Sequence, residues 1–256
     1  MTNQETKKFA PSNIFEGMTS ISAVLNHAES CGRKIEKVLI DVSKKSKKAP
    51  EISFLQAKSK ELGFSLEWVD ANTLNEIATG STHGGILAVC SERQLPLLSE
   101  SEIKPDGFYV FLEGIEDPYN FGYTVRSLYA AGVDGIILPP RNWMNAAGVV
   151  ARASAGTSEM VPMLVSSSDE VAAYFHARGY QILCAGIRDS VSIFEEQFKF
   201  PVLLVIGGEK RGISRNILNS ADKIVRIDYG RAFRGSLCAS AAAAVLAFAL
   251  YEQNKK

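Results

Sequence analysis

The first third of the chain alternates between two kinds of hydrophobic spacing. Residues 20–31 place apolar side chains three or four positions apart, as one face of a helix does, whereas residues 35–41 form a short apolar run typical of a strand. Alternating strands and helices pack as layers, so this part of the chain predicts a small α/β domain. The further elements expected in it are a helix over 51–62, a strand over 64–69, a helix over 72–79 and a strand over 86–90.

Residues 91–106 carry two prolines and several charges, as a linker does. Beyond Gly107 the strands become continuous apolar runs, which are typical of a parallel sheet covered by helices on both faces. We therefore expect an α/β protein with a flexible N-terminus (1–11), a small domain (12–95), a linker (96–106) and a parallel-sheet domain (107–256). The elements expected in the last of these are strands over 107–115, 135–139, 159–165, 180–186, 201–208 and 223–228, and helices over 120–131, 145–153, 168–178, 214–220 and 236–251.

The composition limits the classes of partner. Lys plus Arg equals Asp plus Glu at 28 each, so a nucleic acid would have to be bound through a local basic patch. The 4 cysteines are scattered without a Cys-x-x-Cys pair, and the 3 histidines are isolated. This distribution argues against a disulfide framework and against a metal cluster.

Neither end of the chain predicts a targeting or membrane segment. Residues 1–13 are too polar for a signal peptide. The longest uncharged run, residues 236–251, is shorter than the roughly 20 apolar residues of a membrane span. We therefore expect a cytoplasmic protein.

Gly207 and Gly208 directly follow an apolar strand, residues 202–206. Ligands of open α/β sheets bind outside the carboxyl ends of strands, and glycine lets the backbone approach a ligand closely. The spacing is not the G-x-G-x-x-G of a dinucleotide site. A plain turn between a strand and a helix would use the same two glycines.

Two other segments combine polar residues with a helix. Asn120 and Arg126 fall on one expected helix, and Arg presents a planar fork of donors that suits a phosphate, although it could equally pair with an acid. Ser236 and Ser240 lie one turn apart at the start of the terminal helix, where Ser236 is a suitable N-cap. Cys238, between them, is of a type that is more often buried than reactive.

A run of lysines stands on an expected loop of the first domain. Such a run is usually solvated surface, but it can also supply phosphate contacts that do not depend on sequence. Its members are Lys44, Lys45, Lys47 and Lys48.

Three segments in a fixed order resemble the motifs of the SpoU (TrmH-type) RNA ribose 2'-O-methyltransferases, a family of the SPOUT superfamily. They are residues 120–126 (NFGYTVR), 207–214 (GGEKRGIS) and 236–240 (SLCAS). Residues 154–156 resemble a further family segment between the first two motifs. Residues 35–41 and 82–89 (THGGILAV) resemble the family's substrate-binding domain, so the resemblance covers nearly the whole chain after its first dozen residues.

The resemblance implies a fold and an activity. The second domain would carry the family's trefoil knot, and the protein would transfer a methyl group from S-adenosylmethionine to a ribose 2'-hydroxyl, without a metal and as a homodimer. The RNA would be ribosomal in preference to transfer RNA. The implied catalytic residues are Arg126, as base or as positioner of a substrate phosphate, with Asn120, Glu209 and Ser236. Cofactor contacts are implied for Gly207, Ile227 and Leu237, and RNA contacts are expected for the four lysines, Arg231 and Arg234.

The third motif departs from the family pattern. Cys238 stands where the family has Asn, and a thiol cannot replace the donor and acceptor of an amide. The stretch between Gly230 and Ser236 is also longer and carries Phe233 and two arginines. Two other functions stay open: a catalytically inactive RNA-binding or ribosome-associated protein on the same fold, and a methyltransferase acting on a base nitrogen. The presence of Arg126 and Glu209 argues against the first, and the Asn-x5-Arg spacing argues against the second.

Overall fold

The computed structural model describes residues 13–81, 83–115 and 117–255, so the expected flexible N-terminus lies outside the described residues. The chain forms two compact units. Unit 1 contains the residues up to Gln94 together with Trp143–Met160, and unit 2 contains Leu95–Asn142 and Val161–Lys256. The segment Trp143–Met160 thus packs with unit 1, although in sequence it interrupts unit 2. The domain boundaries expected from the sequence stay a prediction.

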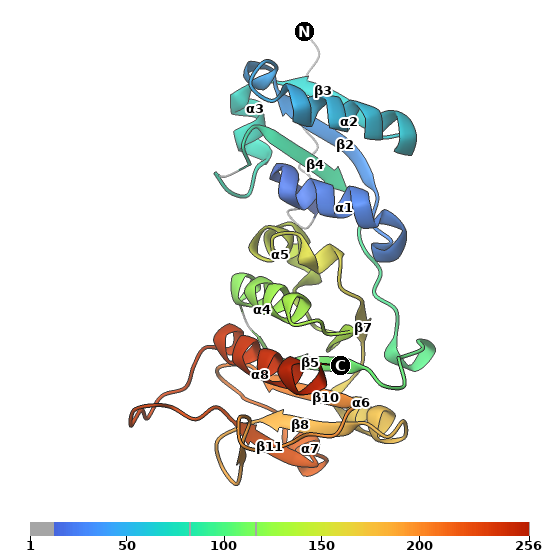
Figure 1. Ribbon diagram of the computed structural model, residues 1–256. Helices are drawn as coiled ribbons and strands as arrows, with labels where there is room; N and C mark the ends of the chain where they lie inside the picture. Colours follow the sequence, from blue (N-terminus) through green and yellow to red (C-terminus); the bar gives the residue numbers. More distant parts are fainter. Residues whose placement is uncertain (1–12, 82, 116, 256) are drawn as a thin grey trace. The chain divides into compact units, whose positions relative to one another are not determined.

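Unit 1 is built on a four-stranded sheet in the order β1-β4-β2-β3 (Figure 1). The central strands β2 (Ile35–Asp41) and β4 (Ile86–Cys90) pair antiparallel, β3 (Ser65–Val69) is parallel to β2, and β1 (Ile14–Glu16) is antiparallel to β4. The helices are α1 (Gly17–Cys31), α2 (Ala49–Leu62), α3 (Ala71–Ile77) and α5 (Ala147–Ala153), with 3-10 turns η2 (Val42–Lys44), η4 (Trp143–Ala146) and η5 (Thr157–Glu159).

The pleat of β2 divides the core of unit 1 into two layers. Val38 and Ile40 belong to the cluster that also holds side chains of α1, α2 and α5, whereas Leu39, between them, packs with Leu74 of α3. Alternate residues of a strand point to opposite faces, so this sheet is covered on both faces. The small α/β domain expected from the spacing is confirmed, while β1 is an additional strand.

Buried polar contacts join the two parts of unit 1. Arg33 Nε donates to Glu159 Oε2 at 3.0 Å, and both side chains are almost completely buried. Arg152 Nη1 donates to Glu16 Oε2 at 2.5 Å. Removal of one member of such a pair leaves an uncompensated buried charge, so these bonds hold Trp143–Met160 in unit 1.

Unit 2 contains a seven-stranded sheet in the order β7-β6-β5-β10-β8-β11-β9, and every neighbouring pair is parallel. The parallel sheet expected from the continuous apolar runs is confirmed. The trefoil knot stays an implication of the family resemblance. The strands are β5 (Phe108–Glu113), β6 (Gly135–Leu138), β7 (Met163–Val165), β8 (Gln181–Ala185), β9 (Val191–Ser192), β10 (Val202–Gly207) and β11 (Lys223–Arg226).

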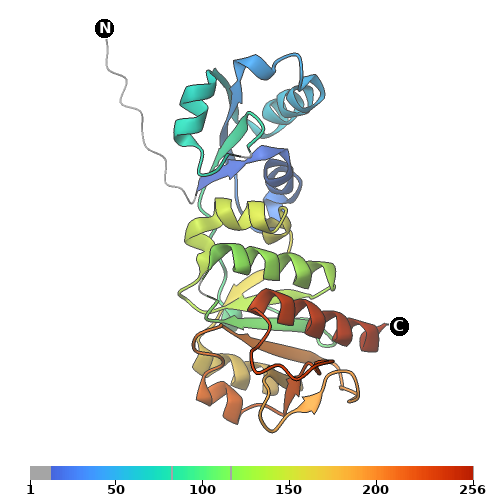
Figure 2. The same cartoon turned by 90° about the vertical axis from the view of Figure 1, so that its left-hand side faces the viewer.

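Helices cover this sheet on both faces. Figures 1 and 2 show α4 (Pro118–Ala130) and α8 (Ala239–Asn254) side by side on one face, with α6 (Ser168–His176) and α7 (Arg215–Asn219) on the other. A 3-10 turn, η3 (Leu98–Glu100), precedes the first strand. In the part of the chain that is described, no helix has the length and apolar character needed to cross a membrane.

The start of the terminal helix differs from the expectation. The helix begins at Ala239 rather than at residue 236, its N-cap residue is Cys238, and no side chain caps it. Ser236 therefore precedes the helix, and the expectation that it is the N-cap was wrong. Residues 236–251 form an uncharged run in the sequence. Ser236, Leu237 and Cys238 are nevertheless exposed in the connection from β11, and the first buried residue, Ala239, is also the first residue of the helix.

Candidate active site

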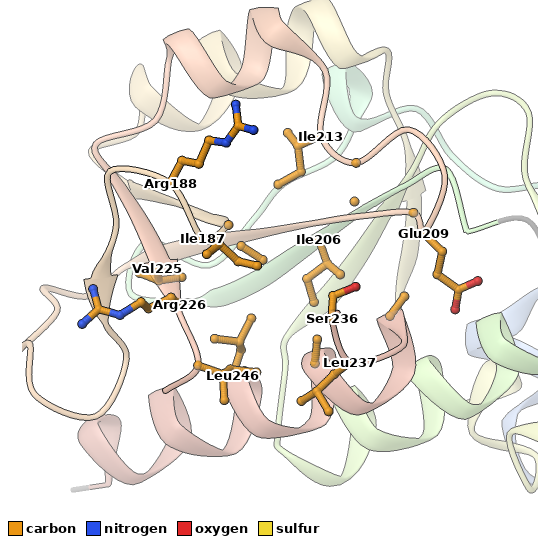
Figure 3. A pocket seen from close by; sticks show the side chains of 18 of the residues that line it. Ile187, Arg188, Ile206, Glu209, Ile213, Val225, Arg226, Ser236, Leu237 and Leu246 are labelled. Atoms are coloured by element: carbon orange, nitrogen blue, oxygen red, sulfur yellow. The ribbon is translucent and has the colours of Figure 1, made fainter. Parts of the chain in front are cut away.

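A cavity of about 350 Å³ opens in unit 2 where several parallel strands end (Figure 3). Its walls come from the turn after β8, from the end of β10 and its loop, from the end of β11 and from the start of α8. Ile187, Ile206 and Leu246 supply apolar walls, while Glu209 stands at one end of the view and Arg188 and Arg226 at the other. This is the position at which open parallel sheets bind ligands.

The end of β10 and the loop after it can be built only with glycine at positions 207 and 208. A Cβ on Gly207 would lie 2.4 Å from the carbonyl carbon of Gly212, and a Cβ on Gly208 would lie 1.8 Å from the carbonyl oxygen of Gly114. The Gly208 N–H donates to the Glu113 carbonyl oxygen at 2.6 Å, and the Gly212 N–H donates to the Gly208 carbonyl at 2.9 Å. The loop therefore folds back on itself and presents backbone groups to the cavity.

The first two motifs meet through a side-chain hydrogen bond. Asn120 Nδ2 donates to Glu209 Oε1 at 3.3 Å. Asn120 is placed by the start of α4, where its own N–H donates to Oδ1 of the N-cap Asp117 at 2.8 Å. Glu209 is placed by the glycine loop and lines the cavity. An amide and a carboxylate thus lie together at the rim of the cavity.

Glu113, at the end of the neighbouring strand β5, accepts hydrogen bonds on both of its carboxylate oxygens. Its Oε1 accepts from the Ser168 hydroxyl at 2.7 Å, and its Oε2 accepts from the Ser214 N–H at 2.8 Å. These bonds connect the end of β5 to the starts of α6 and α7. The chain segments around the cavity are therefore held by polar contacts as well as by apolar packing.

The structure brings most of the expected site residues to this one cavity. Gly207, Glu209, Ile227, Ser236 and Leu237 all line it. Asn120 joins them through its bond to Glu209. The individual roles of these residues stay predictions. Residues of the second and third motifs nevertheless line the same cavity.

Arg126 lies elsewhere on α4. The helix buries Phe121, Val125 and Leu128, whereas Arg126 is exposed and does not line the cavity. Its side chain shares a helix face with Tyr119 and Tyr123, because positions three, four and seven apart lie on the same face. It forms no hydrogen bond or ion pair with any residue that the structure describes.

The residues expected to bind RNA lie in both units. Arg231 and Arg234 are exposed in the connection between β11 and α8 of unit 2. In unit 1, Lys45 Nζ lies 5.7 Å from the centre of the exposed Trp68 ring, and Lys48 Nζ pairs with Glu51 Oε1 at 3.1 Å. Lys44 is half-buried beside Gly85, and Lys47 is exposed.

Cys238 is not the buried hydrophobe that its residue type suggested. It is exposed, its sulfur lies 3.3 Å from the Ser240 hydroxyl oxygen, and this contact together with the Ala241 N–H lowers the pKa of the thiol. By contrast, burial raises the pKa of Cys184 to about 12. Within the described residues, no group of three or more His, Cys, Asp or Glu side chains is arranged to hold a metal ion.

Part of the cavity wall was not expected from the sequence. Ile187 and Arg188 follow the end of β8, Arg226 ends β11, and Tyr229 lies two residues beyond Ile227. The rule that ligands bind at the carboxyl ends of parallel strands, applied to β8 as well as to β10, would have found the first two. Leu246 could not have been found in this way, because it reaches the cavity from the middle of α8.

Comparison with known proteins agrees with this geometry. The curated 23S rRNA (guanosine-2'-O-)-methyltransferase RlmB of Shewanella oneidensis is 26% identical over 251 residues, which are 95% of this chain and 98% of the relative. The crystal structure of an AdoMet-bound rRNA methyltransferase from Sinorhizobium meliloti superimposes with a TM-score of 0.79 at 21% identity, over 95% of this chain and 88% of that one. AviRb from Streptomyces viridochromogenes, in complex with AdoMet, superimposes with a TM-score of 0.75 at 22% identity, over 94% and 89%. These structural likenesses show the fold.

Two family models match in succession along the chain. Residues 14–96 match the model described as RNA 2'-O ribose methyltransferase substrate binding, and residues 107–248 match the model of the SpoU rRNA Methylase family. The second match covers more than half of the chain and includes all three motifs. The family expected from the motifs is therefore confirmed, and so is the expectation of an RNA methyltransferase: the chain belongs to the SpoU rRNA methylase family.

Proposed function

We propose that this protein transfers a methyl group from S-adenosylmethionine to the 2'-hydroxyl of a guanosine in 23S ribosomal RNA. One observation carries the proposal: Asn120 and Glu209 of the first two motifs are hydrogen-bonded at the rim of a cavity whose wall includes Ser236 and Leu237 of the third. The choice of guanosine and of 23S rRNA is supported by the relative from Shewanella oneidensis.

S-adenosylmethionine is the methyl donor, and the cavity suits it. Gly207 and Gly208 leave no room for side chains, so the loop offers backbone donors and acceptors to an adenosyl group. Ile187, Ile206 and Leu246 offer an apolar surface for the flat purine ring. Gly207, Ile227 and Leu237 are the proposed cofactor contacts.

The residues around the cavity have to align the acceptor and help remove its proton. When bound, the sulfonium supplies an electrophilic methyl group, so the new O–C bond replaces an S–C bond and the hydroxyl proton leaves. A ribose hydroxyl is a very weak acid, and an Arg is a poor base at its ordinary pKa. Arg126, exposed on α4 outside the cavity wall, acts on the bound RNA either as base or by holding a substrate phosphate, while Glu209, Asn120 and Ser236 orient the hydroxyl. Alignment of this kind can lower the activation free energy by several kcal/mol.

The RNA is captured by local basic groups, since the formal net charge of the chain is zero. Among the described residues Lys44, Lys45 and Lys47 have no ion-pair partner, and Lys45 lies over an exposed Trp. An exposed aromatic ring beside lysines suits a nucleic acid. Replacement of the lysine run by Gln should raise the dissociation constant for RNA. It should also lower the slope of the salt dependence by about one for each phosphate that a lysine no longer neutralises.

A homodimer is part of the proposal. On α4 and α8, which pack together, Tyr119, Tyr123, Phe248 and Tyr251 are all exposed. Exposed large apolar side chains mark interaction surfaces when they form a contiguous patch, and Phe248 and Tyr251 are in ring contact. Static light scattering at micromolar concentration should give the mass of two chains, and a monomeric mass would contradict this part.

We place the protein in the cytoplasm, where ribosomal RNA of a bacterial cell is made and modified.

The decisive experiment compares methylation profiles of total RNA with and without the gene. The proposal expects one ribose methylation of 23S rRNA to disappear and to return when the gene is restored. Calorimetry with S-adenosylmethionine distinguishes an active enzyme from an inactive RNA-binding protein, because the latter need not bind the donor. Unchanged profiles together with no donor binding would reject the proposal.

A further inference from the structure

The connection between β11 and α8 carries an aromatic pair, one member of which lines the cavity. Tyr229 lines the cavity, and its ring centroid lies 5.8 Å from that of Phe233. The Phe233 side chain is 58% exposed, far more than the rings that form the core of unit 2. An exposed apolar ring of unit 2 therefore stands next to a residue of the cavity wall.

The backbone holds this pair in position. The Leu237 N–H donates to the Tyr229 hydroxyl at 3.2 Å. A Cβ on Gly235 would lie 2.5 Å from Phe233 Cζ and within 3.1 Å of both Cε atoms, so the ring rests against the glycine backbone. A surface whose geometry is fixed before binding loses less entropy when a partner arrives.

Two cationic side chains stand on either side of the exposed ring in sequence. Arg231 and Arg234 are both exposed, and neither has an ion pair or hydrogen bond to another described residue. A flat ring between free guanidinium groups matches single-stranded RNA, whose bases stack on aromatic rings while its phosphates contact arginines. A protein partner with an apolar surface would instead have to bury two charges without partners.

We propose that Tyr229 and Phe233 form a stacking platform for an unpaired nucleobase of the RNA substrate. The platform rests on the proposed function and adds to it the class of acceptor, a nucleotide outside a duplex, since a base inside a helix cannot reach the ring. Phe233 contacts the base, and Arg231 and Arg234 contact the flanking phosphates.

The test compares binding of two labelled strands by fluorescence anisotropy. One is an RNA of alternating cytidine and adenosine, which cannot pair with itself, and the other is an abasic strand of the same length and charge. Phe233→Ala should raise the dissociation constant for the first strand by about 5- to 150-fold, the range expected for the loss of one stacked base. It should leave the abasic strand unaffected, and Phe233→Trp should bind both strands as the parent does.

Companion variants separate stacking from charge and from assembly. Gly235→Ala keeps the ring but displaces it, so it should weaken binding of the base-containing strand alone. Arg231→Gln with Arg234→Gln should weaken both strands alike and flatten the dependence on salt. Calorimetry with S-adenosylmethionine should give the parent's affinity for Phe233→Ala, which verifies that the cavity is intact.

Three outcomes overturn the platform. The parent protein could bind the abasic strand as tightly as the other, Phe233→Ala could affect both strands equally or neither, or Phe233→Ala could convert a dimer into a monomer by light scattering. The last result would make this segment an interface between chains. Absence of methyl transfer to ribosomal RNA would reject the proposed function, whereas it would leave the strand comparison to decide the platform.

Discussion

Asn120 and Glu209 are joined by a hydrogen bond of 3.3 Å across a sequence separation of 89 residues. Asn120 opens α4, and Glu209 stands on the glycine loop after β10. The bond orients a carboxylate that would otherwise be free to rotate at the rim of the cavity. We therefore expect the two side chains to work as one unit.

The first prediction concerns this unit. Asn120→Ala and Glu209→Gln should each lower kcat/KM for methyl transfer by about 10- to 100-fold, because a misplaced acceptor group costs up to that much. The double variant should be little worse than either single one, since residues in direct contact are not additive. Initial rates with tritiated S-adenosylmethionine and ribosomal RNA measure this, with Asn72→Ala, an exposed amide of α3, as control. Strictly additive losses would show that the bond has no role.

The second prediction concerns Arg126, which is exposed and lies outside the cavity wall. Arg126→Ala should nearly abolish turnover, while the affinity for S-adenosylmethionine measured by calorimetry stays that of the parent. Arg126→Lys should recover only part of the rate, because an ammonium lacks the planar fork of donors. Retention of more than about a tenth of the rate by Arg126→Ala would exclude Arg126 as the base, since a general acid–base residue contributes at least about 100-fold.

The third prediction compares two glycines near the cavity. At Gly207 a Cβ would meet the carbonyl carbon of Gly212 at 2.4 Å, whereas at Gly230 nothing lies within 4 Å. Gly207→Ala should therefore raise the dissociation constant for S-adenosylmethionine at least about tenfold, because about 1.4 kcal/mol of strain in the loop suffices for that change. Gly230→Ala should bind as the parent does. Equal affinities for both variants would place the donor elsewhere.

The fourth prediction is a pH dependence of thiol reactivity. The Ser240 hydroxyl and the Ala241 N–H lower the pKa of Cys238, so its thiolate forms at a lower pH than an ordinary thiol. The rate of alkylation by iodoacetamide should rise with pH to a midpoint below the usual value of about 8.5, and Ser240→Ala should move the midpoint upward. Peptide mapping by mass spectrometry should find Cys238 labelled before the buried Cys90 and Cys184.

The same residue tests the departure from the family motif. Cys238→Ser should change the rate of methyl transfer only mildly, because Cys238 already lacks the amide of the family's Asn. In the alkylation experiment above, a midpoint at or above the ordinary thiol pKa would contradict the hydrogen bonds assigned to Cys238. A large loss of rate in Cys238→Ser would give the thiol itself a role.

The fifth prediction concerns the stability of unit 1. Arg33 and Glu159 are a buried pair, with side-chain exposures of 2% and 0%. Glu159→Ala leaves the guanidinium buried without its carboxylate counter-ion and should lower the free energy of unfolding by about 3–5 kcal/mol. The exposed pair Lys58–Glu61 supplies the control, since Glu61→Ala should cost less than about 1 kcal/mol.

Tryptophan fluorescence during urea unfolding measures the free energy of unfolding of unit 1 for both variants. The 2 tryptophans of the chain, Trp68 and Trp143, both belong to unit 1. A loss for Glu159→Ala as small as that for Glu61→Ala would mean that Trp143–Met160 is not held by this pair.

The elements that the sequence predicted well are those with long, regular spacing. The apolar run at residues 201–208 becomes β10 with little change of bounds, and the helix at 120–131 becomes α4. The three-residue strand β1 was missed because so short a segment carries no measurable period. The start of α8 was placed too early because residues 236–238, which precede the helix, belong to the same uncharged run as the helix.

The site was predictable where chemistry is concentrated in short motifs, and less so where it depends on packing. Gly207, Glu209 and Leu237 belong to such motifs, and all line the cavity. The pairing of Arg33 with Glu159 spans 126 residues and follows from the packing of unit 1, which spacing along the chain does not encode. The exposure of Arg126 on α4 likewise could be known only once the buried face of that helix was fixed.

The position of the transferred methyl group is the sharpest test of the proposed activity. The purified protein, tritiated S-adenosylmethionine and 23S rRNA from cells lacking the gene are incubated, and the RNA is digested with a nuclease that needs a free 2'-hydroxyl. We expect the label to remain in one nuclease-resistant dinucleotide that contains a ribose-methylated guanosine, and Arg126→Ala to transfer almost none. Label in a mononucleotide, on a base, or no label in RNA at all would contradict ribose methylation by this protein.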